Sequence, residues 1–130
     1  MVITPNWKNQ SEHINILALS TKVVLEFLTL GFQPILVVDT FSGDKLLNYL
    51  NALYQVDPKL NIKIISLLVD ASEMTIRVQK RESWEFKDLN ICLRLNEDVR
   101  RLKLEKEFQV NTTGRQAQET AEIIFKYLNE

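Results

Sequence analysis

The sequence predicts a single α/β domain, residues 1–130, in which helices on both sides of a short, mainly parallel sheet make three layers. Two apolar runs, at 35–39 and 62–70, carry this prediction. Each is rich in β-branched or other aliphatic residues and ends on an acid, which is typical of a strand buried on both faces. A helical pattern lies between the runs, so the segment reads as a right-handed βαβ unit.

Amphipathic spacing of apolar residues predicts three helices, at 11–30, 43–54 and 115–128. Gly31 is expected to end the first helix, and Pro34 prevents it from resuming. Ser42 is the expected N-cap of the second helix, and a capping box begins at Thr113 before the third. A short strand is predicted at 107–111, directly before that last helix.

The segment 72–104 is a variable region in which the pattern of the residues leaves two readings open. Apolar and polar residues alternate over much of it, which favours strands. Ser72 and Asp88, however, stand where helix N-caps would, and no hairpin turn chemistry lies beside either run. From these residues alone, 73–82 and 88–97 fit either helices or strands.

Composition excludes several classes of function. A net charge of −1 does not fit a dedicated nucleic-acid binder, and a single cysteine, Cys92, excludes an internal disulfide or a cysteine-based zinc site. No apolar stretch reaches the roughly 18 residues of a membrane span, so we expect a cytoplasmic protein with no membrane partner. Residues 1–10 are expected to form an irregular lead-in.

The order of the predicted elements along the chain follows a pattern found in a known protein family. A helix ends in Gly31-Phe32, and the runs PILVVDT (34–40) and IKIISLLVD (62–70) follow. After an arginine-bearing segment, FQVNTTG (108–114) leads into the closing helix. From about residue 20 to 129 this resembles the second half of the small P-loop kinases, which phosphorylate nucleosides, nucleotides and similar metabolites. The resemblance implies a truncated P-loop-kinase-like fold.

The resemblance also implies roles for particular residues. Asp39 matches the family's acidic, catalytic position near the acceptor or Mg²⁺, and Thr40 would line the same cleft. Arg77 and Arg81 match lid arginines that contact ATP phosphates, and the turn containing Thr113 would lie beside the adenine. ATP and Mg²⁺ are therefore the implied cofactors. The family pattern also makes the two ambiguous segments helical.

The family's phosphate loop, G-x-x-x-x-G-K-[ST], has no counterpart in this sequence, which contains three glycines. The strand, loop and helix expected before residue 11 are missing as well. The nearest substitute for a phosphate-binding loop is the helix start that includes Ser42 and Lys45, because helix N-termini attract anions. Asp44 already places negative charge there, which favours plain capping. We therefore do not expect phosphoryl transfer by this chain alone, and a partner chain would have to supply the loop.

Two functions follow from these observations, and whether the chain is an enzyme stays open between them. The first is the binding of a nucleotide or another phosphorylated small ligand, with Arg77 and Arg81 as phosphate contacts. The second is a non-enzymatic interaction module, because a sheet without its usual central strand leaves an edge that a homodimer could cover. In the second reading Asp39 only caps a loop, and the two arginines lie on a solvated face.

Overall fold

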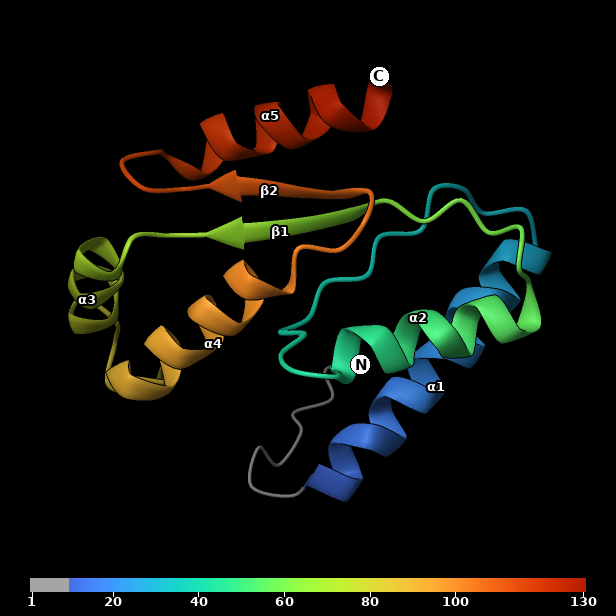
Figure 1. Ribbon diagram of the computed structural model, residues 1–130, viewed down its shortest axis with the longest axis horizontal. Helices are drawn as coiled ribbons and strands as arrows, with labels where there is room; N and C mark the ends of the chain where they lie inside the picture. The colour runs from blue at the N-terminus through green and yellow to red at the C-terminus, as the bar shows by residue number, and fades with distance from the viewer. Residues whose placement is uncertain (1–9) are drawn as a thin grey trace. The chain divides into compact units, whose positions relative to one another are not determined.

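The computed structural model describes residues 10–130, with side chains from residue 16 onward (Figure 1). Most of the predicted lead-in, 1–10, lies outside the described residues. The chain divides into two compact units, one ending at Leu60 and the other running from Asn61 to Glu130. Each unit has its own helices, and the sheet belongs to the second.

The first unit contains two helices, α1 (Gln10–Thr29) and α2 (Lys45–Val56), which confirms both helices predicted there. The two helices pack against each other, and Ser20 Oγ lies 3.0 Å from Tyr49 Oη at their contact. The buried face of α2 consists of Leu46, Tyr49 and Leu53. The N-cap position is Asp44 rather than the predicted Ser42, and its side chain makes no capping hydrogen bond.

The predicted stop at Gly31 is confirmed in detail. Gly31 has a φ of +87°, a backbone conformation that glycine adopts without steric cost. The backbone N–H of Phe32 donates to Phe27 O, and that of Gly31 to Leu28 O, both at 3.0 Å. These two bonds make a Schellman motif, and the rings of Phe27 and Phe32 pack edge to face with centroids 5.4 Å apart. The motif therefore ends α1 where the sequence indicates.

The buried strand predicted at 35–39 is wrong. The segment is irregular, and Leu36 and Val38 are 77% and 85% exposed. Its unit contains no strand among the described residues, so the backbone of 35–39 has no ladder to join. A run of apolar residues gives strand propensity, but a strand also needs a hydrogen-bonding neighbour. The first half of the predicted βαβ unit is therefore absent.

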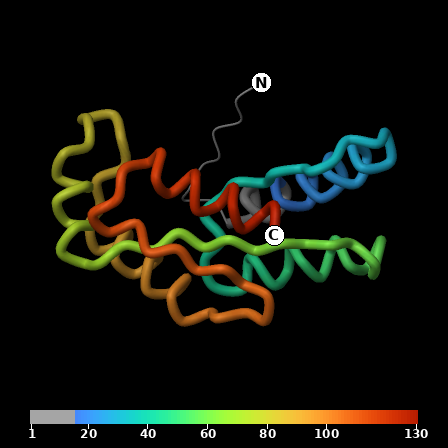
Figure 2. Tube along the Cα trace, turned by 90° about the horizontal axis from the view of Figure 1, so that it is seen from above, coloured from blue at the N-terminus to red at the C-terminus, as the bar shows by residue number. Residues whose placement is uncertain are grey.

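The second unit is built on two parallel strands that run side by side in both views (Figure 1; Figure 2). Its elements in chain order are β1 (Ile64–Leu68), α3 (Ala71–Gln79), α4 (Leu89–Leu102), β2 (Glu107–Asn111) and α5 (Ala117–Asn129). The register pairs Ile64 with Glu107 and Leu68 with Asn111. Both strands and the last helix were predicted from the sequence, and β2 coincides with the predicted strand. The capping box of α5, however, is formed by Gln116 and Glu119 and does not begin at Thr113, as was predicted.

The ambiguous segments 73–82 and 88–97 are helical over 73–79 and 89–97, as the family pattern implied. They correspond to α3 and α4, so the alternation of apolar residues that favoured strands was misleading. Asp88 is the N-cap of α4, and its Oδ1 accepts a 3.0 Å hydrogen bond from the backbone N–H three residues later. The N-cap of α3 is Asp70, not Ser72.

Helices cover both faces of this small sheet. On one face the ring of Phe108 in β2 stacks on Tyr127 of α5, with centroids 4.3 Å apart. On the opposite face the side-chain amide of Gln109 donates to the carbonyl of Arg100 in α4 at 3.4 Å. Neighbouring residues of a strand point to opposite faces, so the second unit has the predicted helix–sheet–helix layering. It is α/β with a two-stranded parallel sheet.

Truncating the buried Leu68 of β1 should destabilise the protein far more than truncating its more exposed neighbour Leu67. Leu68 is 4% exposed and the adjacent Leu67 is 53% exposed. We expect Leu68→Ala to lower the free energy of unfolding by about 2–4 kcal/mol, and Leu67→Ala by less than about 1 kcal/mol. Urea unfolding followed by circular dichroism measures both. Equal losses in the two variants would contradict this assignment of the faces.

Candidate functional site

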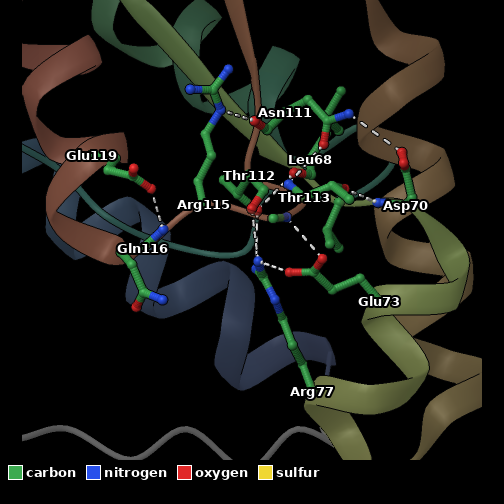
Figure 3. Close-up of polar contacts among 12 residues, drawn as sticks. Leu68, Asp70, Glu73, Arg77, Asn111, Thr112, Thr113, Arg115, Gln116 and Glu119 are labelled. Carbon is green, nitrogen blue, oxygen red and sulfur yellow. Dashed lines mark hydrogen bonds and ion pairs between the residues drawn. The ribbon is translucent and has the colours of Figure 1, made fainter.

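The candidate site is the edge of the sheet where β1 and β2 both end (Figure 3). Because the strands are parallel, the residues that follow them lie at the same edge. Asp70 leads from β1 into α3, and the turn 112–115 leads from β2 towards α5. Open α/β sheets bind their ligands outside the carboxyl ends of the strands, which makes this edge the first place to look for chemistry.

Hydrogen bonds join the two chain segments at this edge. The backbone N–H of Thr112 donates to Leu68 O at 2.7 Å, and the Thr112 hydroxyl donates to the same oxygen at 2.9 Å. The backbone N–H of Asp70 donates to Thr113 Oγ1 at 2.7 Å, and the side-chain amide of Asn111 donates to Asp70 Oδ1 at 3.3 Å. The turn after β2 is therefore held in place by the end of β1.

A second set of contacts, which we call the α3 latch, connects α3 with the same turn through Glu73, Arg77, Thr112 and Gly114. Arg77 Nη1 donates to Thr112 Oγ1 at 3.0 Å, and Nη2 donates to Thr112 O at 2.7 Å. Nη2 also contacts Glu73 Oε1. Glu73 Oε2 accepts a 2.8 Å hydrogen bond from the backbone N–H of Gly114, so both carboxylate oxygens are used.

The latch stabilises the charged form of Glu73. The hydrogen bond from the Gly114 backbone N–H is the largest cause of a pKa below the usual value for this carboxyl, and the Arg77 guanidinium is the next. Partial burial acts in the opposite direction but is outweighed. Glu73 is therefore an ionised carboxylate in which each oxygen has a polar partner. It fixes the orientation of Arg77 and of the turn.

Arg77, predicted as a phosphate contact, uses part of its hydrogen-bonding capacity within the protein. Its contacts with Glu73 and Thr112 occupy three of the five N–H donors of a guanidinium. The side chain as a whole is 39% exposed, and the two remaining donors have no protein partner among residues 16–130. The other predicted residue at this edge, Thr113, uses its hydroxyl oxygen to accept from the Asp70 backbone, which leaves its O–H proton available.

Arg115 is a candidate that the sequence reasoning missed. Its Nε donates to Asn111 O at 3.0 Å, and the close-up shows the rest of the guanidinium pointing away from the turn (Figure 3). Neither Nη atom has a protein partner among residues 16–130. The signal in the sequence was its place directly after Thr112-Thr113-Gly114, a turn that the resemblance had already singled out.

Arg81 does not join this group. Its Nη1 donates to Phe86 O at 2.6 Å and lies 3.7 Å from the buried Cys92 Sγ. Both contacts hold the connection between α3 and α4, beyond the C-terminal end of α3. The structure therefore gives Arg81 a structural role in that connection and brings Arg77, but not Arg81, to the turn after β2.

The remaining predicted residues belong to the first unit. Asp39 Oδ1 accepts a 2.7 Å hydrogen bond from the backbone N–H of Thr40, which is a local turn contact on an exposed segment. The backbone N–H of Lys45 donates to Ser42 O at 3.3 Å in the turn that starts α2. Among the described residues, no cluster of three or more His, Cys, Asp and Glu side chains is placed to hold a metal ion.

Comparisons with known proteins find no match to any protein-family model, curated protein or solved structure. The likeness to P-loop kinases therefore stays a prediction based on the order and spacing of elements. Within residues 10–130, none of the helices combines the length and the hydropathy needed to cross a membrane.

Protonation of Glu73 should weaken the fold in acid. Its pKa is lower in the folded chain than the ordinary 4.5, so the unfolded chain takes up the proton first as the pH falls. The stabilisation is complete above pH 4.5 and is lost as the pH drops through the lower folded value. Urea unfolding between neutral pH and the acid limit should show a steeper loss for the natural chain than for Glu73→Gln.

The matched control for this experiment is Glu105→Gln, because Glu105 is exposed and lies outside the latch. Its stability should follow the natural chain at every pH. If the Glu73→Gln profile also coincides with that of the natural chain, the latch carboxylate does not contribute to the acid sensitivity.

Proposed function

We propose that the carboxyl edge of the β1–β2 sheet binds a nucleotide or another phosphorylated small molecule. The observation that carries this proposal is the convergence of Asp70, Arg77 and the turn 112–115 where two parallel strands end together. Ligands of open α/β sheets bind at such edges. Two arginines contact the end of β2 and this turn, Arg77 through Thr112 and Arg115 through the carbonyl of Asn111.

The contacts of Arg115 and Arg77 within the protein suggest a different role for each in ligand binding. Arg115 is the primary anion contact, because its two Nη atoms are free among residues 16–130 and can engage a phosphate bidentately. Arg77 is a secondary contact through its remaining donors, held in a fixed orientation by Glu73 and Thr112. A site whose groups are already ordered loses little conformational entropy when the ligand binds.

Phosphoryl transfer is not part of this proposal for the chain on its own. Transfer depends on positioning and on stabilisation of the charge of the transferred group, and a Walker-type loop provides much of both. The sequence has no G-x-x-x-x-G-K-[ST] segment. We propose that any kinase activity requires a partner chain that supplies this loop, with Mg²⁺ arriving as the nucleotide complex.

A second candidate function, a protein-interaction module, is favoured by the sparse core. No large side chain among the described residues is fully buried, whereas large apolar side chains are exposed on α1, the segment after it, β1 and α5. Exposed apolar surface of this extent is typical of interaction sites. The part of this surface on α1 is developed below.

Ligand binding should raise the thermal stability of the chain. A ligand at 100 times its Kd adds about 2.7 kcal/mol to the free energy of unfolding, which shifts Tm by several degrees. We expect Mg·ATP or Mg·ADP at millimolar concentration to produce such a shift, and inorganic phosphate a smaller one. Arg115→Ala should abolish the shift without lowering the Tm of the free chain, because its contact in the turn is a single exposed hydrogen bond.

The control is Arg101→Ala, which removes a guanidinium paired with Glu97 on the exposed side of α4. This variant should keep the full ligand-induced shift. The proposal fails if none of the three ligands changes Tm, or if Arg115→Ala and Arg101→Ala respond alike.

A further inference from the structure

Helix α1 exposes a continuous apolar stripe that its own unit leaves uncovered. The stripe consists of Leu19, Val23 and Phe27 together with Leu30 directly after the helix, which recur every three or four residues and are 45–65% exposed. The side of α1 that carries Ser20 and Thr21 is the one turned towards the interior, where Ser20 contacts α2. The stripe lies beside the contact with α2, since Ser20 also lines the groove that the stripe borders.

The stripe forms one wall of an open apolar groove. The opposite wall is the extended segment 35–38, whose Leu36 and Val38 are the most exposed of its side chains. The groove is lined almost entirely by aliphatic and aromatic side chains, with the Ser20 hydroxyl as the polar exception. Such a groove accepts the apolar face of an amphipathic helix.

The charges beside the stripe identify the helix that fits. Lys22 and Glu26 lie one turn apart along one flank of the stripe, and both are exposed. We propose that the occupant is α1 of a second copy of this chain, antiparallel to the first and related to it by a two-fold axis level with Val24. Each charged residue lies two positions from that axis. Lys22 of one copy therefore comes level with Glu26 of the other, twice in the dimer.

The apolar side chains interdigitate in the same arrangement. Leu19 comes level with position 29 of the second copy and so lies between its Phe27 and Leu30. Val23 comes level with position 25 and lies between Val23 and Phe27 of the second copy. A parallel pairing would instead put Lys22 level with Lys22 and Glu26 level with Glu26, and this charge complementarity would be lost. The self-complementary order of charges thus specifies the antiparallel dimer.

Sedimentation of the full chain tests the dimer. The chain has a mass of 15.2 kDa, and we expect the natural protein to sediment with twice that mass. Val23→Glu places a charge in the centre of the stripe and should give a folded monomer, with the helical circular dichroism retained. Arg101→Glu, an exposed change outside the stripe, should remain dimeric. A natural protein that stays monomeric would overturn the proposal and assign the stripe to a different partner.

Charge exchange tests the antiparallel register. In Lys22→Glu both flanking positions are acidic, and in Glu26→Lys both are basic. Each variant alone should dimerise with a Kd several-fold higher than that of the natural chain. An equimolar mixture should form a heterodimer about as tight as the natural dimer, because every pair is again of opposite charge. If each variant alone dimerises as tightly as the mixture, the proposed register is wrong.

Discussion

The α3 latch is the interaction that fixes the geometry of the sheet edge in the second unit. A two-stranded sheet of five-residue strands has little stability of its own and needs packed helices around it. Glu73 and Arg77 attach α3 to the turn after β2, and Asn96 of α4 exchanges two hydrogen bonds with the backbone of Val69, at 3.1 and 2.8 Å. The end of β1, the turn after β2 and two helices are thereby fixed to one another around the same edge.

The same latch also underlies the binding proposed for this edge. An ion pair as exposed as Glu73–Arg77 contributes little to stability through its charges alone. Its effect is geometric, since it orients a guanidinium and a turn that would otherwise sample several conformations. Arg115 is held in a looser way, by one bond from Nε to the chain, so its terminal nitrogens are directed outward.

The sequence was informative where local chemistry decides the structure and misleading where distant partners decide it. The Gly31 stop and the Asp88 N-cap are local, and both are confirmed. The predicted strand at 35–39 needed a neighbour that residue pattern cannot specify, and it is wrong. At the site, the resemblance pointed to Arg77 and the turn with Thr113. It did not reveal Glu73 or Arg115, whose roles depend on the register of two strands that lie about 40 residues apart in the chain.

The two proposed surfaces differ in chemistry because they lie on different units and serve different purposes. The sheet edge is polar, and its hydrogen-bonding groups are largely satisfied within the chain, so a ligand there adds contacts without being needed for folding. The α1 stripe is apolar and faces water in the single chain. Covering it is favourable, and the stabilisation is proportional to the apolar area removed from solvent. A domain of this length normally buries about two-thirds of the surface of its unfolded chain. The many exposed apolar side chains in the described residues show that this chain alone leaves such surface open. In the proposed dimer, association with a second copy would complete the core of the first unit, whereas the second unit already has the order that its proposed site requires.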